Sequence, residues 1–332
     1  MKKKLFGLVF LMAAALAVAA CGGDDEPSHI NLVLPQSAAL GTGGYYSIAV
    51  GEGYFDEEGL EVDIITTSGG AENVQVIISG DAEIVINTGF ASVIGPFKSG
   101  FPIRAISNGD MGSPGTFWIV KADSDIQDWS TDLSGKTVAF SRPGSGTNAT
   151  VLDMVKDYED RGLAPPIPTA TGGTADTLAA TLTGQIDVGW GFYPGTVIEV
   201  LKGTVRPIFA PPDLPGWDNL IVRVIAANAD FLEESPEVAK GFLRAWKKAG
   251  DFATNDPKAA HEYLAEFTGG SVPGDDVISQ FHTYNPVAQR VMVGPAGTNM
   301  AKVYEQAIAG EFISEPLTQA EEAEMFPLDF LP

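Results

Sequence analysis

The sequence predicts an α/β protein built from two similar lobes, and three observations lead to this fold class. Short apolar runs typical of buried strands alternate with amphipathic runs typical of helices, which indicates parallel βαβ units covered on both faces. The length of 332 residues suits about two domains of ~150 residues. One helix–turn–strand pattern also occurs twice, 104 residues apart.

The expected elements follow from apolar periodicity and from Gly and Pro positions. The expected strands are His29–Pro35, Leu60–Thr67, Ile84–Ile86, Ile103–Ile106, Phe117–Val120, Thr137–Phe140, Asp187–Trp190 and Leu220–Ala226. The expected helices are Tyr45–Gly51, Ala71–Ser79, Thr147–Tyr158, Ala175–Leu182, a helix from Pro236 to about Gly250, and another that opens at Pro257. Ser235 is the expected N-cap of the long helix, because Pro follows at its first position.

The repeated pattern is a helix, a glycine that ends it, an acidic turn and a buried strand. When Gly80 is aligned with Gly184, Glu72 matches Asp176 and Glu83 matches Asp187. Common helix–Gly–strand turns could give the same pattern by chance. The spacing favours one copy in each of two lobes.

Composition excludes several classes of function. The chain has 20 Lys and Arg against 43 Asp and Glu, a formal charge of −23. Such acidity argues against a nucleic-acid binder and against docking on anionic lipid through charge. With one Cys and three separated His, we expect no disulfide framework, no metal site and no cofactor.

The first 28 residues resemble an export signal with a lipid anchor. Lys2–Lys4 precede an apolar run of 16 residues, Leu5–Ala20, which is short of the ~20 needed to span a membrane. Val18–Cys21 resembles a bacterial lipobox, and Cys21 is the only cysteine. We expect a signal peptide over 1–20 and a lipidated Cys21 with a tether over 21–28. The alternative is an ordinary signal peptide with an incidental Cys.

Five stretches that together span most of the mature chain carry a family resemblance. They are Gly53–Val62, Ser79–Glu83, Asp132–Ala139, Gly184–Asp187 and Ala226–Ala249. In these stretches the chain resembles the nitrate/sulfonate/taurine and thiamine-pyrimidine group of ABC transporter receptors, the SsuA/NMT1/THI5-like family.

A second resemblance competes with the first. Gly43–Tyr46, Ser68–Asn73 and Pro143–Thr147 are similar to the TAXI receptors of TRAP transporters, which share the fold and often take carboxylates such as glutamate. Gly53–Leu60 and Ala226–Ala249 fit the ABC group better, so an ABC receptor is favoured and a TAXI receptor is the alternative.

The resemblance implies a type II periplasmic-binding-protein fold whose two lobes close on one solute and then dock on a permease. It implies lobe 1 over 29–112 and 217–332 and lobe 2 over 113–216. Hinges are expected near Asp110–Thr116 and Pro211–Trp217. The expected partners are a small solute, ABC permease subunits and the membrane through the lipid, for a monomer outside the cytoplasm.

Ligands of open α/β sheets lie beyond the carboxyl ends of the strands, so the loops there are candidates. These loops are rich in Gly, Ser, Thr and Asn, and several lead directly into helices, whose free N–H groups attract anions. The candidate residues in these loops are Gly43, Gly44, Tyr45, Thr88, Gly89, Phe90, Ser145, Gly146, Thr147 and Asn148. Each stretch is also compatible with an ordinary capped turn.

Aromatic residues gather near the same strand ends. Trp190, Phe192, Tyr193 and Trp217 are candidates for a flat wall that favours an organic solute, such as a sulfonate or a carboxylate, over bare nitrate. Core packing is the ordinary role of each. We expect at least one of Trp190, Phe192 and Tyr193 to line the cleft. A pyrimidine, or an amine held in an aromatic cage, is the contrary possibility.

Enzyme signatures fail when they are read against their required geometry. Ser130–Thr137 lacks the first Gly of a P-loop and continues into a strand instead of a helix. Pro143 stands where a GxSxG elbow around Ser145 needs Gly. The CCCFC-type motif of the thiamine-pyrimidine synthases is absent, since Cys21 is the only cysteine. We expect a receptor and no enzyme, with a sensor or adhesive lipoprotein of the same fold as a third class.

Overall fold

The computed structural model describes residues 27–35, 43–67, 71–111, 115–143, 145–192, 195–217, 220–267 and 299–331. One sheet, with strand order β2-β1-β3-β10-β4, forms the centre of lobe 1. Its strands are β1 (Ser28–Pro35), β2 (Leu60–Thr67), β3 (Ile84–Gly89), β4 (Ile103–Met111) and β10 (Ile221–Asn228). Cys21 lies outside the described residues.

Lobe 2 is centred on five further strands. Three of them form a sheet in the order β8-β5-β9, and two form the pair β6-β7. A parallel bridge between Val138 and Val188 joins β6 to β8, which gives the continuous order β7-β6-β8-β5-β9. The strands are β5 (Thr116–Lys121), β6 (Thr137–Phe140), β7 (Ile167–Ala170), β8 (Gly189–Phe192) and β9 (Val205–Phe209).

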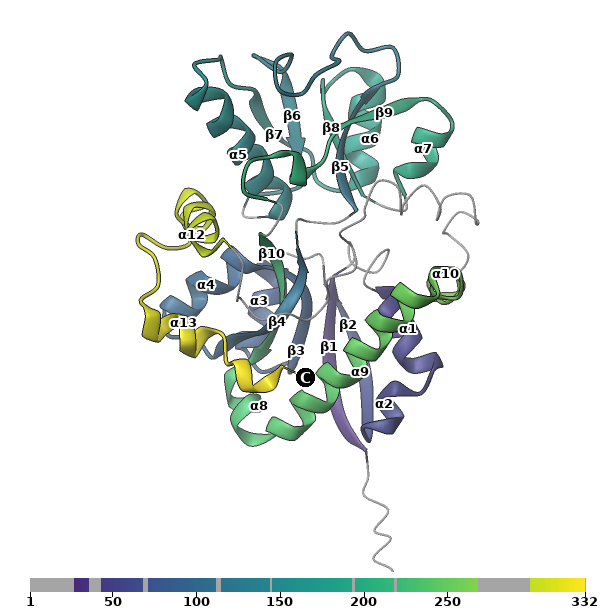
Figure 1. The fold of residues 1–332 in the computed structure, drawn as a ribbon, viewed down its shortest axis with the longest axis vertical. Helices are drawn as coiled ribbons and strands as arrows, with labels where there is room; N and C mark the ends of the chain where they lie inside the picture. The colour runs from purple at the N-terminus through teal and green to yellow at the C-terminus, as the bar shows by residue number, and fades with distance from the viewer. Residues whose placement is uncertain are drawn as a thin grey trace, which may run out of the picture.

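Helices cover both sheets, and Figure 1 shows the two lobes stacked along the long axis. The helices of lobe 1 are α1 (Gly43–Gly51), α2 (Tyr54–Glu57), α3 (Ala71–Ile78), α4 (Phe90–Lys98), α8 (Ala229–Glu234), α9 (Pro236–Asn255), α10 (Pro257–Phe267), α12 (Met300–Ala309) and α13 (Gln319–Met325). The helices of lobe 2 are α5 (Gly146–Asp160), α6 (Thr174–Thr183) and α7 (Val197–Leu201). The predicted division of the chain at 112/113 and 216/217 stays a prediction; it lies between β4 and β5 and between β9 and β10.

The long helix α9 shows how an amphipathic pattern positions an element. Its apolar face packs in the core, where Phe242 stacks on Phe55 at 5.8 Å and on Trp246 at 5.5 Å between ring centroids. The helix begins at Pro236 as predicted, but the Ser235 side chain makes no capping bond. Ser235 also ends α8 and donates its backbone N–H to Phe231, so its backbone is not in the extended conformation of an N-cap.

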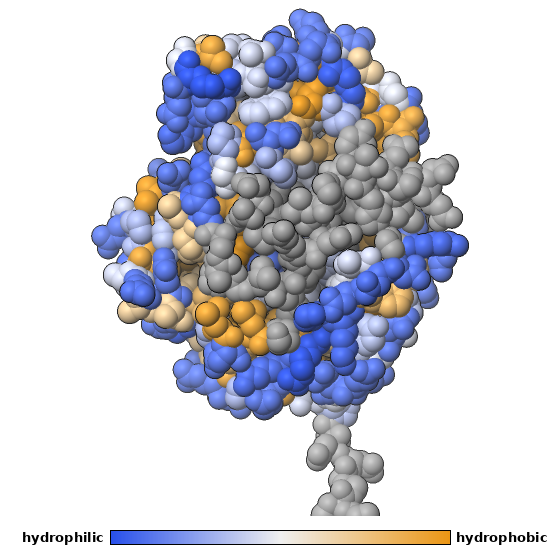
Figure 2. All heavy atoms as spheres, in the orientation of Figure 1, coloured by the Kyte–Doolittle hydropathy of each residue, from blue (hydrophilic) through white to orange (hydrophobic). Residues whose placement is uncertain are grey.

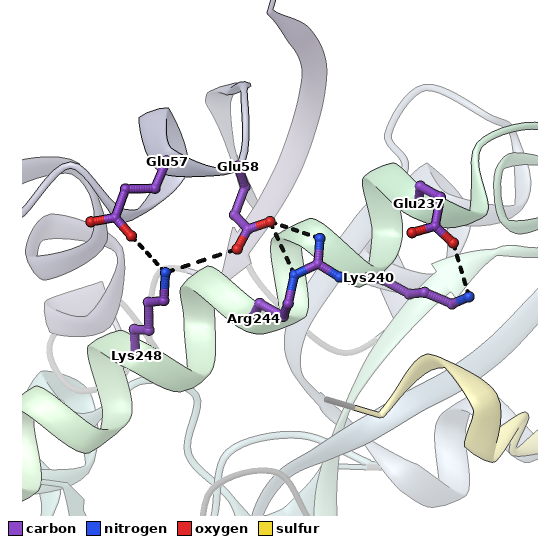
Figure 3. A network of polar contacts seen from close by, with 6 residues as sticks. All are labelled: Glu57, Glu58, Glu237, Lys240, Arg244 and Lys248. Atoms are coloured by element: carbon purple, nitrogen blue, oxygen red, sulfur yellow. Dashed lines mark hydrogen bonds and ion pairs between the residues drawn. The ribbon is translucent and has the colours of Figure 1, made fainter.

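The polar face of α9 is tied to α2 by ion pairs, which Figure 3 shows. Arg244 donates from Nε and Nη2 to Glu58 Oε2 at 3.0 and 2.7 Å, and Lys248 Nζ lies 2.6 Å from Glu57 Oε2.

Hydrophilic residues cover most of the described surface on the face drawn in Figure 2, as the composition leads us to expect. No helix among the described residues is both long and apolar enough to cross a membrane.

The predicted internal repeat is present in both lobes. Gly80 and Gly184 end α3 and α6 with φ of 78° and 75°, the left-handed conformation that favours glycine. Three residues after each glycine comes an acid that accepts a backbone hydrogen bond from a neighbouring strand of the sheet. Glu83 accepts from Asn31 N on β1 at 2.6 Å, and Asp187 accepts from Thr137 N on β6 at 2.9 Å.

The expectation of parallel strands holds for only part of each sheet. β1 is parallel to β2 and β3, and β6 is parallel to β7. β10 is antiparallel to β3 and β4, and β5 is antiparallel to β8 and β9. The reason is the path of the chain, because β5 and β10 each enter their sheet directly after the chain crosses from the other lobe.

Candidate functional site

The N-terminus of α5 lies in a polar loop that follows β6. Ser145 caps α5, its Oγ accepting from Asn148 N at 3.1 Å. The hydroxyls of Ser141, Ser145 and Thr147 lie 2.9 Å from one another and form what we call the hydroxyl cluster. A hydroxyl can both donate and accept, so this cluster can turn its protons toward an incoming group at a helix end that favours negative charge.

The N-terminus of α4 lies at the corresponding place in lobe 1, after β3. Its N-cap is Gly89, which offers no side-chain capping bond, so the first N–H groups of the helix are left for other partners. Thr88 precedes it and is 1% exposed, yet its Oγ1 has no hydrogen-bond partner among the described residues.

A pocket brings these two helix ends together. It is open to solvent and is walled by α4 and its N-cap, α5 and its N-cap, the start of β10, and α12 with the turn after it. Of the predicted residues it includes Gly89, Phe90, Ser145, Gly146 and Asn148. Residues from both lobes therefore line one space, and two helix N-termini point positive ends toward it.

Asn87 places an unusual backbone conformation directly before this site. Its φ is 56°, which is uncommon for any residue other than glycine. Between the pairs Val85–Ala226 and Thr88–Val224, β3 advances three residues while β10 advances two, which is a β-bulge. The buried Oδ1 of Asn87 also has no partner among the described residues. Such bulges re-aim side chains near binding sites.

The predicted aromatic residues have different surroundings. Trp217 is fully buried and donates from Nε1 to Asp153 Oδ2 at 2.8 Å. Trp190 is 6% exposed and packs in the core, but its Nε1 has no partner among the described residues. Phe192 is half-buried beneath the Arg223 guanidinium, 5.8 Å from the ring centroid. Tyr193 lies outside the described residues.

The remaining predicted residues lie on α1 and in the hydroxyl cluster. Gly43 and Gly44 begin α1, and a Cβ on Gly44 would touch Leu264 of α10 at 3.5 Å. The Tyr45 ring packs edge-on against Trp246 of α9 at 6.0 Å. Thr147 is buried within the hydroxyl cluster. A ligand role for all of these residues stays a proposal.

Arg223 is a candidate that the sequence reasoning missed. It lies on β10 opposite Gly89, and its Nη2 donates to Thr116 Oγ1 of lobe 2 at 3.4 Å. Arg223 thus places a cation where the ends of β3 and β8 approach each other. The available signal was a single charged residue within the apolar run Leu220–Ala226. Gln306 of α12, which also lines the pocket, carried no comparable signal.

Comparisons with known proteins identify the family. The NMT1/THI5-like profile matches residues 42–260. A formylaminopyrimidine-binding protein of Halalkalibacterium halodurans is 28% identical over 79% of this chain and 78% of its own. A 4-amino-5-hydroxymethyl-2-methylpyrimidine phosphate synthase of Saccharomyces cerevisiae is 24% identical over 72% and 67%.

Solved structures show the same fold at low identity. The alkanesulfonate-binding protein SsuA of Xanthomonas axonopodis superposes with a TM-score of 0.70 at 15% identity, over 90% of this chain and 98% of its own. The nitrate-binding protein NrtA of Synechocystis gives 0.68 at 13%, over 92% and 87%. The two-lobed fold and the first family resemblance are thereby confirmed, and the TAXI alternative is not favoured. The chain belongs to the NMT1/THI5-like family.

Proposed function

We propose that this protein is an extracytoplasmic receptor that captures a small organic solute between its lobes and delivers it to an ABC importer. The observation that carries the proposal is the pocket walled by the N-termini of α4 and α5, one from each lobe. A solute that touches both helix ends binds best when the lobes are close, which is how a receptor of this kind senses its ligand.

The pocket favours a solute with a negatively charged or oxygen-rich group beside an apolar body. The helix ends and the hydroxyl cluster supply hydrogen-bond donors, and Phe90, Ile221 and Val222 supply apolar walls. The relatives support this class of ligand, since one solved neighbour is named for alkanesulfonate and another for nitrate.

A pyrimidine is the second candidate, and a separate observation favours it. Asn87 Oδ1 and Trp190 Nε1 are buried without a partner among the described residues, one an acceptor and the other a donor. A nitrogen heterocycle carries both donors and acceptors, so it could pair with either of these atoms. The formylaminopyrimidine-binding relative supports this candidate.

Binding without chemical turnover is the role that the described residues support. The hydroxyl cluster has no histidine partner in the described ranges: His29 pairs with Asp63 near the amino end of β1, and His261 lies on α10. Some relatives are named as synthases, so turnover of an aminopyrimidine is an outcome to be measured.

The test is a thermal-shift screen of the full chain against sulfonates, carboxylates, amino acids, aminopyrimidines and quaternary amines. A solute at 100 times its Kd should add about 2.7 kcal/mol to the free energy of unfolding. Ser145→Ala should reduce the shift given by an anion, whereas Ser79→Ala on the exposed end of α3 should not. Hits on aminopyrimidines alone would select the second candidate, and hits on quaternary amines alone would overturn the anion proposal.

The lipid anchor is a further part of the proposal. Cys21 follows the lipobox-like Val18–Ala20, which supports attachment to the outer face of the cell membrane. Fractionation of cells expressing the full chain should place it with membranes, and Cys21→Ser should release it. If the variant stays with the membranes as the wild type does, Cys21 is not the anchor.

A further inference from the structure

Asp153 of α5 is held by three donors that come from outside lobe 2. Its Oδ2 accepts from Trp217 Nε1 at 2.8 Å and from Gln306 Nε2 at 2.9 Å, and its Oδ1 lies 2.8 Å from Lys302 Nζ. We call these four residues the Asp153 cluster. An ionised carboxylate only accepts, so the three donors use its lone pairs well.

The cluster joins the two lobes. Lys302 and Gln306 lie on α12, which packs on α4 of lobe 1. The turn after α12 is tightly docked there, since a Cβ on Gly95 of α4 would lie 2.9 Å from the Phe312 backbone oxygen. Trp217 lies on the segment that returns the chain from lobe 2 to β10. Figure 1 shows α12 between α4 and α5, at the junction of the lobes.

The burial of the cluster makes separation at this edge costly. The side chains of Asp153 and Lys302 are 11% and 14% exposed, and Trp217 is fully buried. Asp153 is the only described partner of the Trp217 indole N–H. Moving α5 away from α12 would leave that N–H buried and unpaired and would break a largely desolvated ion pair.

The pocket lies beside the cluster and shares one residue with it. Gln306 belongs to both, and Ala149 and Leu152 of α5 line the pocket close to Asp153 in the chain. At the cluster the lobes are bridged by side chains, whereas at the pocket the two helix ends are separated by open space. The lobes are therefore joined at one edge and open beside it.

We propose that Asp153 is the pivot of lobe movement, an interlobe anchor that fixes the edge about which the cleft opens and closes. The arrangement of the lobes without solute then depends on this carboxylate. The inference goes beyond the proposed function, because it holds whatever the solute is, and its test needs no solute.

The experiment measures the distance between the lobes by pulsed electron–electron spin resonance. Spin labels go on Gln75→Cys of α3 and Ala179→Cys of α6, two exposed positions that correspond in the repeat. The full chain carries Cys21→Ser, so these are its only thiols. Asp153→Asn and Lys302→Gln are compared with Asp160→Asn, which removes an exposed α5 carboxylate paired with Lys156 inside lobe 2.

We expect one narrow distance distribution for the parent and for Asp160→Asn, and a broader, shifted distribution for Asp153→Asn and Lys302→Gln. If Asp153→Asn does not fold, Lys302→Gln alone decides. An unchanged distribution in a folded variant overturns the proposal, even if its melting temperature falls, because the cluster is then only a static contact. An equal shift in Asp160→Asn also overturns it.

Discussion

Lobe 1 and lobe 2 build sheets of the same order, β2-β1-β3-β10-β4 and β7-β6-β8-β5-β9, and differ at the carboxyl ends of the corresponding strands β3 and β8. The shared parts are the helix-ending glycines Gly80 and Gly184 and the acids Glu83 and Asp187. In lobe 1, β3 carries a bulge and the polar pair Asn87–Thr88. In lobe 2, β8 pairs regularly with β5, and its end is aromatic.

This difference separates the residues that hold the fold from those that recognise a solute. The repeated glycines and acids form contacts within one lobe and recur because both sheets need them. The end of β3 offers hydrogen-bonding groups, whereas the end of β8 offers ring faces. At the pocket itself, lobe 2 contributes the hydroxyl-rich start of α5, and lobe 1 contributes the apolar residues Phe90, Ile221 and Val222.

The largest effect on stability should come from giving the core of lobe 2 the residue that lobe 1 has at the corresponding position. Gly189 of β8 corresponds to the buried Val85 of β3. A Cβ on Gly189 would lie 2.1 Å from Thr181 Oγ1 of α6, so Gly189→Val should lower the free energy of unfolding by about 3 kcal/mol through overpacking. Urea unfolding measures this.

Gly195→Ala is the control, because nothing lies within 4 Å of its added Cβ. Its free energy of unfolding should stay within about 0.5 kcal/mol of the parent. If Gly189→Val also changed the free energy of unfolding by less than about 0.5 kcal/mol, α6 would have to move away from β8 easily. The packing of helix on strand would then be more alike in the two lobes than the structure indicates.

Removing either repeated acid should have an intermediate effect. Glu83→Ala and Asp187→Ala each leave a strand N–H without its carboxylate and should cost ~1–2 kcal/mol of unfolding free energy. Asp81→Gln, which copies Gln185 of lobe 2 into the same turn, should change little. If only one of the two Ala variants lost much of its unfolding free energy, the two acids would not be equivalent.

The lobe 2 acid should also make stability depend on pH. Burial raises the pKa of Asp187, but the hydrogen bonds from Thr137 and the charge of Lys136 outweigh burial and hold it below its ordinary 3.8. Because folding lowers the pKa of Asp187, its contribution to the free energy of unfolding is complete above the pKa of the unfolded chain. That contribution is lost as the pH falls through 3.8 and below. The difference between the parent and Asp187→Ala should therefore shrink between about pH 5 and pH 2.

The smallest effect on stability should come from the bulge. Asn87→Gly copies Gly191 of lobe 2 and relieves the left-handed backbone, so it should leave the free energy of unfolding unchanged or raise it by up to ~1 kcal/mol. The same variant should weaken binding of any solute found in the screen. Glu311→Gly, at the other non-glycine residue with positive φ (59°) in the described chain, should give a similar change in stability; it lies between the pocket residues Gly310 and Phe312, so it is a control for the backbone effect on stability alone.

Much of the scaffold could be predicted from the sequence, because its signals are local. The apolar run Thr137–Phe140 is β6 as predicted, and the repeated glycines do end corresponding helices. The antiparallel direction of β5 and β10 was not predicted, since strand direction depends on where the chain crosses between lobes. The bulge at Asn87 needs the register of β10, which lies far along the chain.

The sequence predicted the site only where the composition of a loop indicates it. The Gly- and Ser-rich start of α5 lies on the pocket. The link from Asp153 to Gln306 joins residues 153 positions apart, and no periodicity within either helix points to it. Gln306 lines the pocket and Arg223 lies beside Gly89 and Thr116 because of the lobe arrangement, which one sequence does not encode locally.

The order of strands in lobe 1 has a consequence for how the molecule is made. All five strands of lobe 2 lie within residues 116–209, a continuous piece of chain. The sheet of lobe 1 has a gap between β3 and β4 that is filled only by β10, residues 221–228. During synthesis from the N-terminus, the edges of β3 and β4 remain unpaired and open to wrong partners until β10 is available. The lobe that starts second is therefore the first whose sheet can be complete.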